Sequence, residues 1–511
     1  MRALLSVWNK SGLEEFARGL EELGFELVAS GGTAAYLEEL GLEPERVEDL
    51  TETPELLGGR VKTLHPRIHA AILARRDRDA DLETLERQEI RPFDLVCVNL
   101  YPFEQVAARW GVSEEDAVEL IDIGGPSLLR GAAKNFAHVA PVCRPEQYPG
   151  VLAELGAEGR LSVETRRRLA TEAFATTAAY EATIASWFAD RDTFPATITA
   201  SYTKVADLVY GENPHQRAAF YAEVGARTHV LSMVRQVAGK DLSFNNVLDL
   251  NSGRLLVDEF EVPACAIIKH NNPCGVAIGS SGREAYERAL ACDPQSAFGG
   301  VVCLNRPVDR ALAEVLLAQF CEVLFAPRFA DDALALLESK PAMRVLEDNE
   351  QRRFDIAERD LKRVMGGLLV QDRDIDLEDR SEMQVVTERK PTEGEWGEML
   401  FGWKVCKHVR SNAIVLSREL ASVGIGAGQM SRVDSVRLAV EKAREVGTDL
   451  QGSALASDAF FPFADGPALA VSAGVTSIIQ PGGSKRDPEV VEAADAAGIS
   501  MVFTHRRHFR H

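Results

Sequence analysis

Apolar and polar residues alternate along the first part of the chain in the order expected of strand, helix, strand and helix. Residues 3–8 are apolar, an amphipathic stretch runs from Ser11, a candidate N-cap, to Leu23, and residues 25–29 are apolar again after Gly24. A second helical stretch follows at 34–40. Because the hydrophobic period changes from two to about 3.6 between these segments, the pattern predicts a β-α-β-α beginning and an α/β fold class.

Short apolar runs elsewhere predict strands that are buried on both faces of a sheet. They lie at residues 93–100, 139–143, 262–268, 301–304 and 499–503. Helical patterns cover 145–190, 253–261, a stretch capped by Ser280 or Ser281, and 433–446. Pro195 and several threonines interrupt the helical signal at 191–200, so we predict two domains, residues 1–190 and 200–511.

Composition limits the classes of function. The chain has 511 residues, a net charge of -21 and a pI near 5.1, which argues against a general affinity for nucleic acid or for anionic membranes. Its eight cysteines include no C-x-x-C pair, a usage typical of reduced thiols rather than of a zinc site or a disulfide framework. With no apolar run long enough to span a membrane and no targeting segment, we expect a cytoplasmic protein.

The most informative stretch is the end of the apolar run 262–268, where Lys269 and His270 follow directly. Open α/β sheets place ligands at such strand ends, and a lysine beside a histidine favours a neutral imidazole that can accept a proton. We expect residues 271–275 to form a loop. The alternative interpretation is a strand-end pair that faces solvent.

Two N-terminal segments suggest an anionic ligand. Residues 30–33, Ser-Gly-Gly-Thr, open the predicted helix, whose N-terminus favours phosphate, although a Gly-Gly turn is often only a turn. Residues 58–69 concentrate two arginines, a lysine and two histidines, which suits a multiply anionic ligand unless the segment is a solvated basic loop. His65 and His69 have the spacing of a metal pair, but the glutamate of a metalloprotease motif is missing.

Further candidates occupy the ends of predicted elements. Tyr101, Asp122 and Lys134 each follow or precede a strand or helix signal. The run 424–428 is glycine-rich, but Gln429 stands where a dinucleotide fingerprint needs its third glycine. Residues 458–466 join three phenylalanines to two aspartates, which fits either a core or a loop beside a flat heteroaromatic ligand. Arg507, in the basic tail, could fold back to hold a phosphate.

Taken together, the motifs resemble those of one known family over nearly the whole chain. The N-terminal half carries G-G-R-V-K-T-L-H-P, N-L-Y-P-F, I-D-I-G-G and A-A-K-N. The C-terminal half carries Y-G-E-N-P-H-Q, K-H-x-N-P-C-G, S-A-F-G-G, S-N-A-I, G-I-G-A-G-Q and D-A-F-F-P-F. The chain resembles the bifunctional purine biosynthesis family that joins IMP cyclohydrolase to phosphoribosylaminoimidazolecarboxamide (AICAR) formyltransferase.

The resemblance implies a fold and a pair of reactions. It implies a methylglyoxal-synthase-like domain, two cytidine-deaminase-like subdomains without zinc, and a homodimer. It also implies that a formyl group passes from 10-formyltetrahydrofolate to the 5-amino group of AICAR, and that the product FAICAR closes to IMP by loss of water. The substrates would be AICAR, FAICAR and folate, with no metal required, although a structural monovalent cation remains compatible.

For the formyltransferase, the resemblance implies a catalytic set in which His270 is the base for the AICAR amine and Lys269 stabilises developing charge. Its other catalytic members are Asn412 and Asp465. The implied substrate-binding residues of this half are Tyr210, His215, Lys240, Gly299, Gly300, Arg432, Phe461 and Arg507.

For the cyclohydrolase, the resemblance implies Lys62, Tyr101, Asp122 and Lys134 around the closing ring. The implied substrate-binding residues are Lys10, Ser30, Gly31, Gly32, Thr33, Arg60, Thr63, Asn99, Gly124 and Gly125. Ring closure depends mainly on positioning and proton shuttling.

Four positions depart from the family pattern: Val209 in place of a frequent arginine, Trp8 in place of a small serine, Asn271 in place of alanine, and Phe136 in place of His or Tyr. Two other classes of function are also considered. One is a nucleotide-sensing module that lost its chemistry, which intact Lys269 and His270 argue against. The other is a dinucleotide-dependent oxidoreductase built on residues 424–428, which the missing third glycine disfavours.

Overall fold

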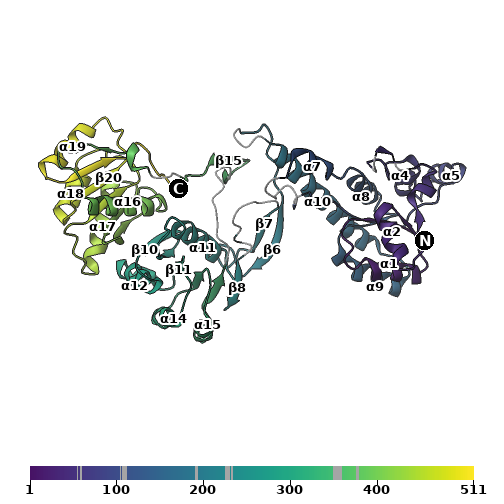
Figure 1. Cartoon of the computed structure of the whole chain (residues 1–511), viewed down its shortest axis with the longest axis horizontal. Coiled ribbons are helices and arrows are strands. Elements are labelled where there is room, and N and C mark those ends of the chain that lie inside the picture. Colours follow the sequence, from purple (N-terminus) through teal and green to yellow (C-terminus); the bar gives the residue numbers. More distant parts are fainter. Residues whose placement is uncertain are drawn as a thin grey trace. The chain divides into compact units, whose positions relative to one another are not determined.

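The computed structural model describes residues 1–54, 56–57, 60–103, 105, 112–189, 194–224, 231, 234–348, 359–375 and 379–511. Met1–Thr203 form most of one compact unit, and Lys204–Ala222 begin a second that continues to His511 (Figure 1). The predicted end of the first domain at residue 190 lies outside the described residues, as do 191–193 of the predicted junction and Gly58 and Gly59.

The first unit is a parallel five-stranded sheet with the order β3-β2-β1-β4-β5. Its strands are β1 Arg2–Val7, β2 Glu26–Ala29, β3 Glu45–Arg46, β4 Leu95–Asn99 and β5 Ala140–Val142. Its helices are α1 Leu13–Glu22, α2 Gly31–Glu39, α3 Val47–Thr51, α4 Pro66–Leu73, α5 Asp79–Arg87, α7 Glu114–Glu119, α8 Gly124–Lys134, α9 Tyr148–Glu158 and α10 Val163–Phe188, with a 3-10 turn at Pro145–Gln147. The predicted β-α-β-α beginning is confirmed.

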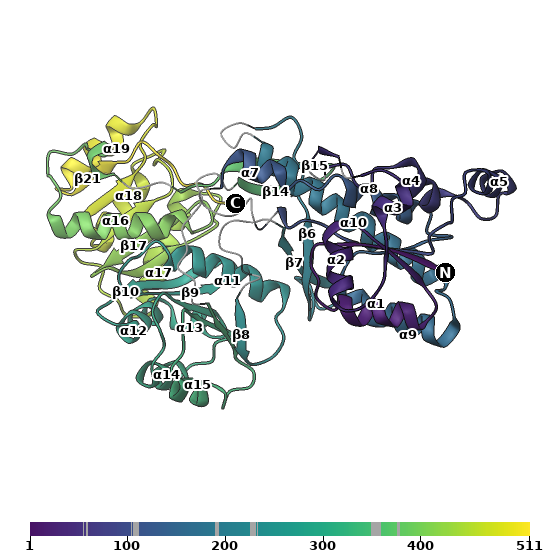
Figure 2. The same ribbon diagram turned by 45° about the vertical axis from the view of Figure 1, so that its right-hand side comes forward.

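Alternate residues of the strands bury their side chains against different helices, which makes three layers (Figure 2). Ala3 and Leu5 of β1 pack with α1, α2 and α9, whereas Leu4 packs with α4, α8 and α10. Both faces of the sheet are therefore covered, as continuous apolar strands require. β2 and β4 lie on opposite sides of β1, so their carboxyl ends flank a topological switch point, where sheets of this class bind ligands.

The second unit contains a mixed sheet of twelve strands. Its first half comprises β8 Arg235–Ala238, α11 Phe244–Val257, β9 Ala264–Lys269, β10 Asn272–Ile278, α12 Gly282–Cys292, α13 Pro294–Ala297, β11 Val301–Leu304, α14 Arg310–Leu316, β12 Val323–Ala326, α15 Asp331–Leu337 and β13 Arg344–Glu347. Its second half comprises β16 Gln384–Val385, α16 Glu393–Lys407, β17 Ile414–Arg418, β18 Ala421–Gly426, α17 Arg432–Glu445, β19 Ala454–Ser457, α18 Asp465–Ala473, β20 Ser477–Gln480, α19 Asp487–Ala496 and β21 Ser500–Phe503. Outside this sheet lie the pairs β6 Tyr202–Leu208 with β7 Ala218–Glu223 and β14 Arg359–Val364 with β15 Gly367–Asp372, and a 3-10 turn at Arg380–Glu382.

The two halves of the twelve-stranded sheet have the same topology. The first half runs β10-β9-β11-β12-β13-β8 and the second runs β18-β17-β19-β20-β21-β16. In both halves the third strand pairs parallel with the fourth and the fourth with the fifth, and the other neighbouring pairs are antiparallel. β10 and β18 pair antiparallel through Ala277 and Ala421 and join the halves. No repeat at a fixed period is visible in the sequence, so the duplication is a finding of the structure.

β9 confirms the strand predicted at 262–268, but the loop predicted after it is wrong. The chain turns within two residues, His270 and Asn271, and continues as β10 from Asn272. Both turn residues have positive φ, as a two-residue hairpin loop requires. A register shift between Pro273 and Gly275 accommodates the proline, which is why a strand contains a residue that usually signals a loop.

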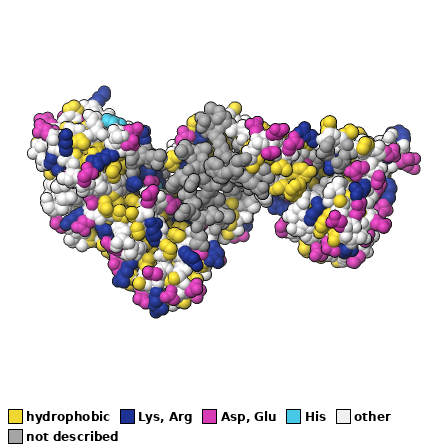
Figure 3. Space-filling model, in the orientation of Figure 1, with side chains coloured by type: hydrophobic (Ala, Val, Ile, Leu, Met, Phe, Trp, Pro, Cys, Tyr) yellow, Lys and Arg dark blue, Asp and Glu magenta, His cyan; other side chains and the backbone are white. Residues whose placement is uncertain are grey.

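The helix predicted at 253–261 is placed too late. α11 begins at Phe244, because Ser243 and Asn246 form a reciprocal capping box at its N-terminus, and it ends at Val257. No helix among the described residues is long and apolar enough to cross a membrane. Acidic and basic side chains are mixed over the face shown in Figure 3, without a continuous basic surface.

Candidate active sites

A cavity of about 720 Å³ opens in the first unit at the switch point of the sheet. It lies where β1, β2 and β4 end and where α2 and α8 begin. Its lining residues are Ser6, Val7, Trp8, Lys10, Ser30, Gly31, Gly32, Thr33, Arg60, Lys62, Thr63, Leu64, Asn99, Tyr101, Val118, Glu119, Ile121, Asp122, Ile123, Gly124 and Gly125. All the residues predicted for the cyclohydrolase, except Lys134, are among them.

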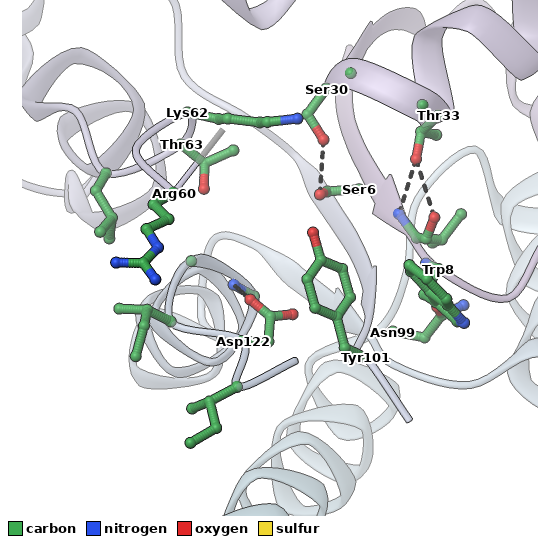
Figure 4. Close-up of a pocket in the computed structure, with 18 of the residues that line it drawn as sticks. Ser6, Trp8, Ser30, Thr33, Arg60, Lys62, Thr63, Asn99, Tyr101 and Asp122 are labelled. Atoms are coloured by element: carbon green, nitrogen blue, oxygen red, sulfur yellow. Dashed lines mark hydrogen bonds between the residues drawn. The ribbon is translucent and has the colours of Figure 1, made fainter. Parts of the chain in front are cut away.

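Two helix N-termini supply backbone donors to this cavity. Ser30 is the N-cap of α2, and its carbonyl accepts from the N–H of Thr33 at 2.8 Å. The N–H groups of Gly31 and Gly32, at the first two positions of the helix, have no carbonyl of a preceding turn to donate to. The Ser30 hydroxyl donates to Ser6 Oγ at 2.7 Å, and Thr33 Oγ1 accepts from the N–H of Val7 at 3.0 Å (Figure 4). A helix start of this kind favours an anion such as phosphate.

The start of α8 is also shaped by glycine. A Cβ at Gly125 would lie 2.3 Å from Asp122 Oδ2, so a side chain there would displace the carboxylate. Instead, the N–H of Gly125 donates to Asp122 Oδ1 at 2.8 Å. The glycine therefore lets the helix start approach the aspartate directly.

Three cations border the cavity. Lys10 is half-buried, which lowers the pKa of its ammonium group, and its Nζ donates to the carbonyl of Val7. Arg60 is exposed and pairs with Glu119. Figure 4 shows the side chains of Lys62, Tyr101 and Asp122 directed into the same space. The cavity is thus lined by three cations and by two carboxylates, Glu119 and Asp122.

Asp122 is the titratable carboxyl at the centre of this group. Burial raises its pKa above the ordinary value of an aspartate, while hydrogen bonds from the backbone N–H groups of Gly125, Tyr101 and Gly124 oppose the shift. Its own N–H donates to the hydroxyl of Tyr180 at 2.8 Å, which fixes the loop before α8. An aspartate with a raised pKa is suited to exchange a proton with a substrate.

Lys134 does not lie with the other predicted residues. It is the last residue of α8 and is exposed, whereas the cavity lies at the first residues of that helix. Eleven residues at 1.5 Å each separate the two ends by roughly 15 Å. The helix carries the chain to the amino end of β5, so within one chain the sequence-based placement of Lys134 at the closing ring is not supported.

In the second unit, Lys269 and His270 end β9 as predicted. Lys269 Nζ donates to the carbonyl of Phe298 at 2.8 Å, which places it beside Gly299 and Gly300. A Cβ at Gly300 would lie 2.9 Å from the carbonyl of Ile268, so only glycine permits this approach to β9. A second cavity, of about 210 Å³, is lined by Lys269, His270, Asn272, Pro273, Cys274, Cys292, Asp293, Ser296, Ile425 and Lys442.

Asn412 lies two residues before β17, in a polar group with the buried Arg432. Its Oδ1 accepts from Arg432 Nη2 at 2.7 Å, and its Nδ2 donates to the carbonyls of Gln429 and Met430 at 2.9 and 3.1 Å. Arg432 is 7% exposed and also pairs with Asp458. The Arg432 guanidinium therefore holds the side chain of Asn412 in place.

The other predicted residues of this unit lie in loops, at helix ends or in the C-terminal tail. Tyr210 and Lys240 lie in adjacent loops, since the N–H of Phe244 bonds the carbonyl of Tyr210 and the N–H of Val209 bonds the carbonyl of Leu242. His215, Lys240, Asp465 and Arg507 are exposed. Arg507 stacks over the ring of Phe509 at 4.6 Å.

Phe461 requires a correction. Its side chain is 1% exposed and packs in the core with residues of β17, α17 and α18, so its ring is not accessible from the surface in this structure. Phe460 and Phe463 are 39% and 50% exposed and are the accessible rings of this segment. Asp293 and Lys442, which form an ion pair at 2.8 Å beside Lys269, were missed because neither belongs to a recognisable motif.

Comparisons with known proteins agree with this architecture. Residues 132–442 match the family model described as the AICARFT/IMPCHase bienzyme, and residues 12–127 match the model of the MGS-like domain. A solved structure titled "Crystal structure of ForH" is 42% identical to the chain and covers 37% of it and 99% of its own length, with a TM-score of 0.33.

Proposed function

The chain belongs to the AICARFT/IMPCHase bienzyme family, and from this premise we propose that its two units divide the two reactions of the family between them. The family's reactions are formyl transfer from 10-formyltetrahydrofolate to AICAR and the closure of FAICAR to IMP, in purine biosynthesis. We assign ring closure to the cavity of the first unit and formyl transfer to the loops around Lys269 and Asn412. The gathering of the predicted cyclohydrolase residues at one cavity is the observation that carries this assignment.

For ring closure, the carboxamide nitrogen of FAICAR attacks the formyl carbon, and the formyl oxygen leaves as water. The N-termini of α2 and α8, with Lys10 and Arg60, provide donors and positive charge for the substrate phosphate. Lys62 and Tyr101 then supply hydrogen-bond donors to the formyl oxygen as it becomes negative. Asp122 accepts the proton that the carboxamide nitrogen loses and returns it to the departing oxygen, which takes its second proton from the formamide nitrogen.

For formyl transfer, the amine of AICAR attacks the formyl carbon of the folate. That amine is a poor nucleophile because its lone pair is delocalised into the ring, so it must lose a proton as it attacks. We assign this proton to His270, whose side chain is exposed at the hairpin turn. The Lys269 ammonium stabilises the oxyanion or the leaving nitrogen, and removing one such donor typically costs about 3 to 4 kcal/mol of transition-state stabilisation.

Asn412 and Asp465 complete the assignment by orienting the amine and the folate. Arg432 holds Asn412, so the amide of Asn412 is fixed before substrate binds. No step in either proposed reaction passes through a metal ion.

We further propose that the chain acts as a homodimer in the cytoplasm. Tyr202, Val209 and Tyr221 of the β6 and β7 region are 49%, 57% and 51% exposed, and Met365, at the tip of the β14–β15 hairpin, is fully exposed. Exposed apolar side chains concentrated on two-stranded sheets are typical of surfaces that a second chain covers. Sedimentation of the purified protein tests the dimer. The two cytidine-deaminase-like subdomains fit the two halves of the twelve-stranded sheet.

A pair of variants tests the division of the reactions. His270→Ala should abolish formyl transfer and leave the conversion of added FAICAR to IMP intact, and Lys62→Ala should do the reverse. Both reactions are measured on the same preparation of each variant. The activity that a variant retains then shows that the protein has been produced in folded form. Loss of both activities in folded protein, from either change, would show that the two-site assignment is wrong.

A further inference from the structure

The hairpin turn that carries the proposed catalytic base has an unusual backbone. His270 and Asn271 adopt left-handed conformations in succession, with φ of 54° and 60°. Residues with a Cβ seldom occupy this region, so neighbouring groups must hold the turn in place. The direction of the His270 side chain depends on this turn.

Asp249, on α11, contacts the turn through both carboxylate oxygens. Its Oδ1 accepts from the N–H of Asn271 at 2.6 Å, and its Oδ2 accepts from the N–H of His270 at 3.3 Å. Two successive N–H groups are thus held by one carboxylate. Hydrogen bonds to a charged acceptor are stronger than neutral ones, so Asp249 is well suited to stabilise a left-handed pair.

Ser252 lies three residues further along α11 and therefore on the same helix face. It is 3% exposed, its hydroxyl donates to Asn271 Oδ1 at 3.0 Å, and it accepts from Arg510 Nη2 at 3.1 Å. Arg510 Nη1 donates to the carbonyl of His408 at 3.1 Å, and its own carbonyl accepts from the N–H of Ser411 at 2.9 Å. A chain of hydrogen bonds therefore joins the turn to the segment that carries Asn412.

We propose that Asp249, Ser252 and Arg510 are positioning residues for formyl transfer: they fix the turn that holds His270 and set its position relative to Asn412. This proposal rests on the assignment of His270 and Asn412 to that reaction. The three residues act through the turn and touch no substrate. Their contribution lies in orientation, where a displacement of about 1 Å can lower a rate by roughly 100-fold.

The second half of the sheet contains the same arrangement without the histidine. Glu419 and Leu420 form the turn between β17 and β18, with φ of 54° and 58°. Glu398, on α16, accepts from the N–H of Leu420 at 2.8 Å. An acidic side chain on the preceding helix thus holds the turn in both halves, but only the turn in the first half carries Lys269 and His270. Glu398 is therefore the matched control for Asp249.

The first test compares Asp249→Asn with Glu398→Gln. The Asn amide has one oxygen acceptor where the carboxylate has two, so it can accept from only one of the two N–H groups of the turn. The turn should therefore loosen, although the side-chain volume is nearly unchanged. We expect Asp249→Asn to lower the kcat of formyl transfer by about 10- to 100-fold, with the KM for AICAR changed by less than about threefold. Glu398→Gln should leave kcat within about twofold of the unmodified protein, because its turn carries no proposed catalytic side chain. Ring closure of FAICAR by the first unit should be unchanged in both variants.

The second test asks whether Ser252 and Arg510 form one chain of contacts. If they do, Ser252→Ala, Arg510→Met and the double variant should show non-additive losses of kcat, with the double variant no slower than the worse single variant by more than about twofold. Guanidinium ion at a non-denaturing concentration should restore part of the kcat of Arg510→Ala. Arg506→Met, which removes an exposed arginine of the same tail, is the matched control and should retain formyl transfer.

Several outcomes would overturn the proposal. They are additive losses from Ser252 and Arg510, equal losses from Asp249→Asn and Glu398→Gln, or formyl transfer within twofold of normal in Asp249→Asn. If Asp249→Asn lost ring closure as well, its effect would be general misfolding and the proposal would fail. Failure of the underlying assignment is separate, because it would show as retained formyl transfer in His270→Ala.

Discussion

The ring of Trp8 lies 5.0 Å from the ring of Tyr101 between centroids, with the two planes inclined at 59°. Both residues line the cavity of the first unit, and they are 51% and 37% exposed. Asn99 holds this wall in place, since its Oδ1 accepts from the N–H groups of Trp8 and Asn9 at 2.6 and 2.8 Å. The pair therefore forms an aromatic wall of the cavity, against which the imidazole ring of FAICAR would pack in the proposed reaction.

Replacing Trp8 should weaken substrate binding without removing ring closure. An aromatic pair contributes about 0.5 to 1.5 kcal/mol beyond its buried area, so Trp8→Ser should raise the KM for FAICAR by roughly 3- to 10-fold, and Trp8→Phe by less. Steady-state kinetics of ring closure measure the change. IMP should also quench tryptophan fluorescence in the unmodified protein more than in Trp8→Phe. An unchanged KM in Trp8→Ser would mean that the wall does not contact the substrate.

Asp122 should make stability depend on pH. Its pKa is raised in the folded state, so the folded protein holds this proton more tightly than the unfolded chain does. Stability is therefore lost as the pH rises from the unfolded pKa, near 3.9, through the raised folded pKa. Asp122→Asn should be more stable than the unmodified protein at pH 8, and the difference should shrink towards pH 4. Thermal unfolding at both values measures this, and a variant less stable at pH 8 would contradict the expectation.

Lys10 should make substrate binding depend on pH on the alkaline side. Burial lowers the pKa of its ammonium group from the ordinary value of 10.5, and a phosphate dianion needs the charged form. Affinity for FAICAR should therefore be full below the lowered pKa and should fall as the pH rises through it. Lys10→Met should raise the KM at neutral pH and remove this alkaline limb from a profile of kcat/KM against pH. Persistence of the limb in Lys10→Met would assign it to another group.

Phe461 should act on stability rather than on chemistry. Truncating a fully buried phenylalanine costs about 3 to 5 kcal/mol, so Phe461→Ala should unfold the second unit at a clearly lower urea concentration. Phe460→Ala, at an exposed ring of the same segment, is the control and should shift the transition little. Equal shifts in the two variants would show that the burial of Phe461 does not determine its contribution to stability.

The sequence predicted the elements whose signals are local. The strands at 95–99, 264–269 and 301–304 are continuous apolar runs, and Ser281 caps α12 where a cap was expected. These strands and this cap depend on period and on residue type, which a sequence displays directly. The cyclohydrolase residues of the first cavity were predicted as a full set only from the resemblance of their motifs to a known family, and the fold brings those motifs to one edge of the sheet.

The features that were missed depend on contacts between distant segments. The end of a helix can lie at either edge of a sheet, so the position of Lys134 in the chain did not show which edge it occupies. The run 458–466 contains three phenylalanines, and the sequence alone does not show which of them is buried. Packing against other segments buries Phe461. Asp249 carries no motif of its own, and its contact with the turn is made from another element 21 residues away. The two halves of the sheet repeat one strand order, but no repeat at a fixed period is visible in the sequence.

The antiparallel pairing of β10 with β18 joins two halves of the same topology, of which only the first carries Lys269 and His270 at its turn. A gene duplication followed by fusion would leave such a pair, each copy inheriting a sharp turn and an acidic residue to hold it. If the turn at His270 serves formyl transfer and its counterpart at Glu419 serves folding alone, equivalent positions in the two halves should tolerate very different ranges of amino acids in related chains, although the strand order is the same.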